Sequence, residues 1–259
     1  MQFTGLENVQ QIDQYILKKE ISRGGMGVVY LAEDIQLHRP TALKVILKQS
    51  ENDSTISIKR FHREMEVMGK LSHPYVIQIY TAGMFQNNPY IAMEYVDGVP
   101  LLEYAQQLPE NDFISIAKLM QKILQAFSYI HSKQLVHRDV KSTNILVRPN
   151  GDPVILDFGL AKAKDIKTLT ATGTIIGSLN MSPEQARGMT RNVNHQSDIY
   201  SLGTILYEIL TKQPVVQSNS FIELLKEIIY KDPILPSQWN PSIPPMLEYI
   251  TLKSLEKKQ

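Results

Sequence analysis

The sequence predicts an α+β fold in two parts, a small β-rich part with one main helix and a larger, mostly α-helical part. From residue 15 to residue 95, short runs of β-branched and aromatic residues alternate with turn residues. From residue 101 onward, apolar residues recur three and four positions apart, the spacing of an amphipathic helix. One such stripe consists of Ile116, Leu119, Met120, Ile123, Leu124, Phe127 and Ile130. The change falls near Asp97 and Gly98, so we expect a hinge around residues 94–98.

The composition is that of an ordinary globular protein. Of 259 residues 43% are hydrophobic, which is enough for a large core, and 27 Lys and Arg against 26 Asp and Glu give a formal net charge of +1. This balance creates no overall field for nucleic acid or an anionic membrane, and we expect neither as a partner. The absence of cysteine excludes disulfides, a thiol nucleophile and cysteine-type zinc sites. No signal-peptide pattern and no long apolar run occurs, so we expect a soluble chain without a membrane segment.

In the first part we expect strands over residues 27–34 and 41–47. A glycine-rich run, ISRGGMGVVY at residues 21–30, lies between two predicted strands. Its glycines would let backbone N–H groups approach phosphate oxygens closely. Taken alone, the run fits a plain hairpin turn equally well.

Lys44 stands in an otherwise apolar strand, where its ammonium group needs an anionic partner. The main helix of this part is expected over Ser57–Lys70, and its apolar stripe consists of Ile58, Phe61, Met65 and Met68. Glu64 shares the inward face of that helix, so we pair it with Lys44. A lysine that reaches solvent from an edge strand, with a glutamate at the stripe margin, is the alternative for either residue alone.

Two short runs in the second part carry the most chemistry, HRDVKSTNIL at residues 137–146 and ILDFG at residues 155–159. Asp139 and Lys141 supply a carboxylate and an amine. Asn144 and Asp157 supply hard oxygen donors suited to Mg²⁺ or Mn²⁺. Together these groups can hold a polyphosphate with its metal ion and aim a hydroxyl group at its end. Singly, each could instead be a turn former or an ordinary polar residue.

These runs, together with RGGMGVVYLAED, SPEQA and SDIYSLGTILYEILT, resemble bacterial eukaryotic-like (Hanks-type) serine/threonine protein kinases. The resemblance covers nearly the whole chain from Tyr15 onward. It implies the bilobal kinase fold, with residues 1–14 as an N-terminal extension, residues 15–96 as the N-lobe and residues 97–259 as a C-lobe that lacks its C-terminal end. It also implies a non-specific serine/threonine protein kinase that transfers the γ-phosphate of ATP, with Mg²⁺, to protein hydroxyl groups.

The resemblance assigns roles to the candidate catalytic residues. Asp139 would accept or orient the proton of the incoming hydroxyl group, and Lys141 would neutralise charge on the transferred phosphoryl group. A lysine at position 141 accompanies Ser and Thr substrates in the family. Lys44 would contact the α- and β-phosphates while Glu64 holds it in place.

The resemblance also assigns binding roles. Asn144 and Asp157 would bind the metal ion. The residues expected to contact ATP are Ser22, Gly24, Gly27, Val29, Ala42, Lys44, Glu94, Val96 and Leu146. Ser22 replaces the first glycine of the family's loop.

The segment between Asp157 and Glu184 is rich in threonine and resembles an activation loop. We expect autophosphorylation at Thr170 and Thr172, and Arg138 is the residue expected to pair with the phosphate. A homodimer that phosphorylates itself in trans is compatible with this hypothesis. The alternative is a solvated threonine-rich loop.

The stretch Asp232–Pro245 contains five prolines and the only tryptophan of the sequence, and it predicts an ordered surface loop that is poor in helix.

Near the end of the chain, the run SDIYSLGTILYEIL at residues 197–210 predicts a long buried helix. Asp198 would cap its N-terminus, and by resemblance it would also anchor the catalytic-loop backbone. Asn180 stands where relatives have an aromatic residue, which leaves substrate specificity open. In the family, Glu184 pairs with an arginine whose position would follow residue 259. Either the chain is a trimmed piece, or another group replaces that arginine, or the second lobe is less stable than usual.

Two other functions stay open at this point. A pseudokinase that binds nucleotide as a scaffold would account for the departures at Ser22, Ser178 and Asn180, although no residue required for phosphate chemistry is missing. A small-molecule kinase fits the SPE run and the threonine-rich segment less well. The need for ATP and the lack of a signal peptide favour a cytoplasmic location. A membrane-anchored longer chain and delivery into a host cell are the alternatives.

Overall fold

The structure is a computed structural model that describes residues 10–24, 27–46, 65–86, 88–157, 180–218 and 220–257. The chain divides into two compact units, residues 1–97 and residues 98–259. The first is built mainly of strands and the second mainly of helices, which confirms the predicted α+β class. None of the helices in the described ranges is both long and apolar enough to cross a membrane.

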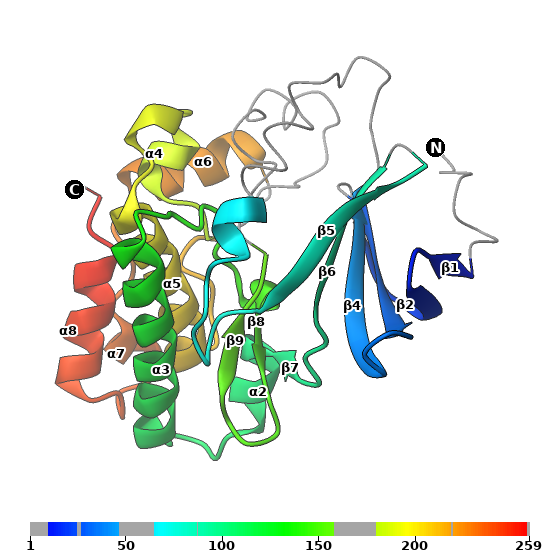
Figure 1. The fold of residues 1–259 in the computed structure, drawn as a ribbon. Coiled ribbons are helices and arrows are strands. Elements are labelled where there is room, and N and C mark those ends of the chain that lie inside the picture. The colour runs from blue at the N-terminus through cyan, green and yellow to red at the C-terminus, as the bar shows by residue number, and fades with distance from the viewer. Residues whose placement is uncertain are drawn as a thin grey trace. The chain divides into compact units, whose positions relative to one another are not determined.

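The first unit contains an antiparallel β-sheet, in which the described strands follow the order β1-β2-β3-β4-β6-β5 (Figure 1). Its strands are β1 (Gln11–Ile12), β2 (Tyr15–Gly24), β3 (Gly27–Asp34), β4 (Arg39–Ile46), β5 (Ile79–Phe85) and β6 (Asn88–Glu94). Of the predicted helix over Ser57–Lys70 the described part begins at residue 65. Residues 65–68 are helical, and Met65 and Met68 are buried as predicted.

Strand β1 lies within residues 1–14, the predicted N-terminal extension. Ile12 pairs with Tyr15 across a tight turn, and both side chains are almost completely buried. Asp13 in this turn has a φ of 48°, and it accepts a hydrogen bond from the Tyr90 hydroxyl group. Residues 11–12 are therefore part of the sheet. A two-residue strand is too short to give a periodic signal.

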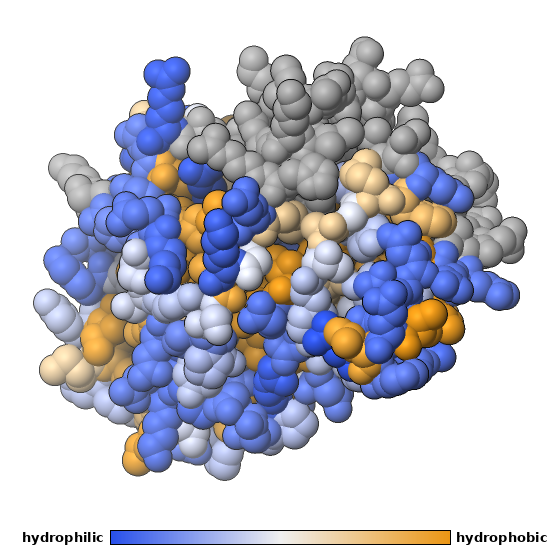
Figure 2. All heavy atoms as spheres, viewed as in Figure 1, coloured by the Kyte–Doolittle hydropathy of each residue, from blue (hydrophilic) through white to orange (hydrophobic). Residues whose placement is uncertain are grey.

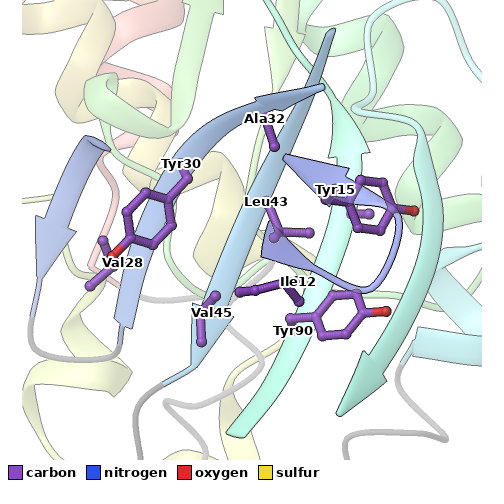
Figure 3. Packing of buried hydrophobic residues seen from close by; sticks show 9 residues of the cluster. Ile12, Tyr15, Val28, Tyr30, Ala32, Leu43, Val45 and Tyr90 are labelled. Carbon is purple, nitrogen blue, oxygen red and sulfur yellow. The ribbon is translucent and has the colours of Figure 1, made fainter. Parts of the chain in front are cut away.

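The two faces of the sheet differ because successive side chains of a strand point to opposite sides. One face forms the core of the first unit, and Figure 3 shows its side chains packed against each other. They are Ile12, Tyr15, Val28, Tyr30, Ala32, Leu43, Val45 and Tyr90, with Ala92. The opposite face carries Val29 and Lys44, which are paired across β3 and β4, and the similarly paired Leu31 and Ala42.

The second unit consists of helices and one small sheet. Its elements are β7 (Val99–Pro100), α2 (Leu101–Gln107), α3 (Phe113–Ser132), β8 (Ile145–Val147), β9 (Pro153–Ile155), α4 (Pro183–Ala186), α5 (His195–Thr211), α6 (Phe221–Tyr230), α7 (Pro236–Trp239) and α8 (Pro245–Ser254), with 3₁₀ turns at Ser142–Asn144 and Thr190–Asn192. Helices α3, α5 and α8 run side by side (Figure 1). Gly203 allows α8 to approach α5 closely, because a Cβ atom there would lie 2.1 Å from Ser254 Oγ.

The predicted apolar stripe of α3 is correct except at one position. Its buried members are Ile116, Leu119, Met120, Ile123, Phe127 and Ile130. Leu124 was expected among them, but it is 43% exposed. It lines a groove with Leu247 and Ile250 of α8, where the helix face turns toward solvent.

The proline-rich segment from Asp232 to Pro245 is ordered by side-chain contacts. Trp239 Nε1 donates to the Tyr207 hydroxyl group at 2.9 Å, and that hydroxyl group donates to the Ile234 carbonyl at 3.0 Å. The segment was expected to be poor in helix, and its one short helix, α7, begins at a proline, which suits a first helical position. Elsewhere the surface is mixed. In the view of Figure 2, hydrophilic residues cover most of the described surface and apolar residues appear in separate groups.

Candidate active site

The catalytic loop, residues 137–144, is held by a buried carboxylate on α5. Asp198 is 1% exposed. Its Oδ2 accepts the backbone N–H of His137 at 2.9 Å, and its Oδ1 accepts that of Arg138 at 2.9 Å. The His131 ring of α3 also lies 2.9 Å from Oδ2. The predicted anchoring of the loop by Asp198 is confirmed, whereas His131 was not foreseen.

The predicted role of Asp198 as a helix cap is wrong. Helix α5 begins at His195, and the Asn194 side chain accepts the N–H of Gln196 at 2.7 Å. Asn194 and Ser197 complete a capping box. Since Asn194 satisfies the start of the helix, the carboxylate of Asp198 is available for the loop.

Arg138 adopts a left-handed backbone conformation. Its φ is 66°. For a residue with a side chain this conformation costs roughly 1–3 kcal/mol and persists only where the surroundings fix it. The hydrogen bond from its N–H to Asp198 is one such restraint. The strained residue directly precedes the candidate catalytic Asp139.

The buried side chain of His137 connects the catalytic loop to the segment that contains Asp157. Its Nε2 lies 2.8 Å from the Leu156 carbonyl, while Nδ1 accepts the N–H of Asp139 at 3.3 Å. Because Nδ1 accepts, the ring proton is on Nε2 and is donated to Leu156. Burial lowers the pKa of His137, although the carboxylates of Asp198, Asp139 and Asp157 act in the opposite direction. The imidazole is therefore neutral near pH 7.

The two expected metal ligands lie at one end of the β8–β9 hairpin. Ile145 pairs with Ile155, and the Leu156 N–H donates to the Asn144 carbonyl at 2.8 Å. This register puts Asn144 beside the residue that precedes Asp157. Asp157, like Arg138, has a positive φ, here 29°.

The Asn144 side chain is oriented by Asp139. Its Nδ2 donates to the Asp139 carbonyl at 2.9 Å and to Asp139 Oδ2 at 3.2 Å. Both partners are acceptors, so the amide oxygen of Asn144 is directed away from Asp139. That oxygen and the Asp157 carboxylate fit Mg²⁺, which usually takes one or two protein ligands and completes its shell with water and phosphate oxygens. Across the described ranges, no group of three or more His, Asp or Glu could bind a metal ion.

Asp139 and Lys141 lie next to each other. Lys141 Nζ is 3.5 Å from Asp139 Oδ2. The Lys141 side chain is 37% exposed and the Asp139 side chain 13%. The pair combines a carboxylate that can orient a hydroxyl proton with a cation that can stabilise a developing negative charge. The second unit thus brings Asp139, Lys141 and Asn144 together. Leu146 follows in β8, where it pairs with Pro100 and Val154.

In the first unit, the expected nucleotide-binding side chains share one face of the sheet. Val29 is paired with Lys44, and Ala42 is paired with Met93 of β6. All four side chains point away from the core face, as the alternation along a strand requires. Glu94 ends β6, and its N–H donates to the Gln78 carbonyl at 2.9 Å. Val96 is buried.

The glycine-rich hairpin contains two glycines with different surroundings. Gly24 and Gly27 are paired at its end, and Ser22 pairs with Val29. A Cβ atom on Gly27 would lie 2.1 Å from the Val45 carbonyl oxygen, and its φ is 155°. A Cβ atom on Gly24 would meet nothing within 4 Å. Gly27 is thus required by the sheet, whereas the space beside Gly24 is open.

Three of the predicted site residues have no placement. Glu64, Thr170 and Thr172 lie outside the described residues. The predicted pair of Lys44 with Glu64 and the two predicted phosphorylation sites stay predictions.

Two polar contacts connect the segment after residue 179 to α5. Asn180 Nδ2 donates to Thr204 Oγ1 at 2.7 Å, so a hydrogen-bonded pair occupies the position where an aromatic residue was expected in relatives. The Ser197 hydroxyl group donates to the buried carboxylate of Glu184. A neutral donor on α5 therefore contacts Glu184.

Comparison with known proteins agrees with this geometry. Residues 15–256 match the family model described as a protein kinase domain. The chain belongs to the protein kinase family. Since the match includes both units, it covers the glycine-rich hairpin as well as the catalytic loop.

Similar proteins have related names. The chain is 41% identical over 249 residues to a protein of Lactococcus lactis named probable serine/threonine-protein kinase PknB, covering 95% of this chain and 39% of that protein. It is 37% identical over 245 residues to the serine/threonine-protein kinase PrkC of Bacillus subtilis, covering 94% and 37%. It is 37% identical over 254 residues to the serine/threonine-protein kinase PknB of Mycobacterium leprae, covering 95% and 40%. The chain thus spans about two fifths of the length of these relatives.

Proposed function

We propose that this kinase domain transfers the γ-phosphate of ATP, in the presence of Mg²⁺, to Ser and Thr hydroxyl groups of proteins. One observation carries the proposal: Asp139, Lys141 and Asn144 converge on a loop whose backbone is fixed by the buried Asp198. The names of the relatives support Ser and Thr as the substrate class. Lys141 supports the same substrate class, because a lysine at this position accompanies Ser and Thr substrates in the family.

In this proposal the chain contributes position and charge. Asp139 accepts or orients the proton of the substrate hydroxyl group, and Lys141 stabilises the negative charge of the transferred phosphoryl group. The Asp139 carboxylate accepts a hydrogen bond from the Asn144 amide, which links the proposed base to a proposed metal ligand. Mg²⁺, held by Asn144 and Asp157, would neutralise phosphate charge, and Mn²⁺ offers the same coordination chemistry.

Residues of both units are proposed to bind ATP. Lys44 would contact the α- and β-phosphates with Glu64 as its partner. The full set of proposed ATP contacts is Ser22, Gly24, Gly27, Val29, Ala42, Lys44, Glu94, Val96 and Leu146. The shared strand face of Val29, Ala42 and Lys44 supports this part of the proposal. The need for ATP supports a cytoplasmic location for the domain.

We extend the proposal to regulation by autophosphorylation. Thr170 and Thr172 would be phosphorylated, in trans within a homodimer, and Arg138 would pair with the phosphate. Mass spectrometry of the active protein should find phosphate on one or both threonines. An unmodified segment in protein that phosphorylates other substrates would contradict this extension.

The test of the main proposal is transfer of labelled γ-phosphate to the chain itself and to a generic basic protein. The matched control is Asp139→Asn, which keeps an oxygen acceptor for Asn144 but removes the charge. Label on Ser or Thr that disappears in the control establishes the activity. If both proteins are silent while ATP with Mg²⁺ still raises the melting temperature, the chain is a nucleotide-binding pseudokinase.

A further inference from the structure

The left-handed Arg138 is held on both sides of its backbone. Its N–H donates to Asp198 Oδ1 at 2.9 Å, and its carbonyl oxygen accepts a hydrogen bond from Gln185 Nε2 at 2.8 Å. Asp198 comes from the long helix α5, whereas Gln185 comes from the short helix α4. Two different elements therefore fix the residue that precedes Asp139.

The Gln185 side chain joins α4 to the catalytic loop in a defined orientation. Its Oε1 accepts the N–H of Ser182 at 2.9 Å and the hydroxyl group of Ser182 at 3.2 Å. A backbone N–H can only donate and the Arg138 carbonyl can only accept, so the amide cannot be turned around. The Gln185 side chain is thus hydrogen-bonded to the start of α4 through its oxygen and to the catalytic loop through its nitrogen.

Helix α4 begins at Pro183, in the run Ser182–Glu184 that closes the predicted activation segment. A displacement of Ser182 would move the oxygen end of Gln185 and so strain or break the bond to Arg138. Arg138 is in turn the residue proposed to respond to phosphate on that segment.

We propose that Gln185 is a positioning residue that couples the Ser182–Glu184 run to the catalytic loop, and thereby sets the orientation of Asp139. The inference rests on the proposed kinase function for its effect on rate, but not for the coupling itself. A simpler reading is that Gln185 only completes the capping box of α4, because its bond to Ser182 alone would serve that purpose. The helix-cap reading needs only the oxygen of the Gln185 amide, whereas the coupling also needs its NH₂ group.

Two substitutions separate the halves. Gln185→Glu keeps the oxygen that accepts from Ser182, but puts a second oxygen against the Arg138 carbonyl. Gln185→Met keeps the length and loses both halves. Gln125→Glu is the matched control, since it makes the same chemical change on an exposed position of α3.

The first measurement is amide hydrogen exchange. We expect the N–H groups of His137 and Arg138 to exchange about tenfold faster in both Gln185 variants, since a restraint on a strained backbone is lost. Amides in the middle of α5 should keep their wild-type protection, and Gln125→Glu should match the wild type throughout. Unchanged exchange in Gln185→Glu, or an effect in Gln185→Met alone, would reduce Gln185 to a helix cap and overturn the proposal.

The second measurement is the rate of phosphate transfer. We expect kcat to fall about tenfold in Gln185→Glu while KM for ATP changes less than twofold, because orientation of Asp139 acts on the chemical step. Faster exchange in a chain whose wild type transfers no phosphate would leave the coupling standing and sink the proposed function. If the wild type is active and both Gln185 variants match it in exchange and in kcat, the proposed function stands and the coupling is overturned.

Discussion

The strand face of the first unit and the catalytic loop of the second unit are built by different means. On the strand face, Val29 and Lys44 are positioned by the backbone ladder between β3 and β4, which are neighbours along the chain. In the loop, the N–H groups of His137 and Arg138 are fixed by a carboxylate 61 and 60 residues away. The first arrangement needs only the register of a sheet, whereas the second needs particular buried side chains.

The difference predicts how each region responds to mutation. The strand face should tolerate side-chain changes and fail only where a new atom collides with the backbone. The loop should fail when the buried carboxylate of Asp198 is removed, because two backbone N–H groups then lose the acceptor that holds them. Stability measurements on variants from each region test this comparison.

The largest effect is expected for Asp198→Ala. The change leaves two backbone N–H groups and the His131 ring without their acceptor in the core, and should lower the free energy of unfolding by about 3–5 kcal/mol. Denaturant unfolding measures this quantity. The control is Asp112→Ala, where the lost acceptor caps α3 through the Ser115 N–H at 3.1 Å, and where about 1 kcal/mol is expected. Equal losses in the two variants would contradict the comparison.

Gly27→Ala tests a position of the strand face where a new atom would collide with the backbone. The added Cβ atom would lie 2.1 Å from the Val45 carbonyl oxygen, and the residue would keep a φ that favours glycine. We expect a loss of about 2–4 kcal/mol in the free energy of unfolding. Gly24→Ala is the control. It should cost almost no stability, because its Cβ atom would meet nothing within 4 Å. It should weaken ATP binding, because that space is where the phosphates are proposed to bind. Similar stability losses at both glycines would remove the distinction between them.

The same contrast explains which features the sequence could predict. Strands β3 and β4 and helix α3 follow from periodic patterns that depend on local burial. Strand β1 does not, because two residues carry no period. The contacts of His131 and Gln185 were also missed, since their partners lie 67 and 47 residues away and a polar side chain on a helix gives no sign of what it meets.

Two roles were predicted for Asp198. The role inferred from the family resemblance is correct, and the role inferred from the local sequence is wrong. Its anchoring of the catalytic loop came from the family pattern and is confirmed by the two N–H bonds. Its role as a cap came from its position near the start of an apolar run, but Asn194 begins the helix earlier. Capping residues compete locally, and the choice among neighbours depends on the backbone angle at which the chain enters the helix.

A smaller effect is expected at the pair formed by Asn180 and Thr204. Thr204→Val removes the oxygen that accepts from Asn180 at 2.7 Å and should cost about 1–2 kcal/mol of the free energy of unfolding. Combining it with Asn180→Ala should cost less than the sum of both changes, because the bond can be lost only once. Thr251→Val is the control, since that buried hydroxyl group donates to the Leu247 carbonyl of its own helix, and its loss should add to that of Asn180→Ala. Additive losses would show that the pair does not interact.

The smallest effect is a pH dependence that belongs to His137. Burial puts its folded-state pKa below the ordinary value of 6.5, so below about pH 6.5 the unfolded chain takes up a proton before the folded chain does. Its contribution to stability is therefore complete above that pH and declines as the pH falls, by less than about 1 kcal/mol between pH 7.5 and pH 6.

His137→Gln should remove this slope while an N–H donor is kept for the Leu156 carbonyl. The measurement is the free energy of unfolding at several pH values in both proteins. The difference between their slopes isolates His137, because His73, whose pKa burial also lowers, is present in both. If the slopes coincide, His137 is not held neutral by the fold.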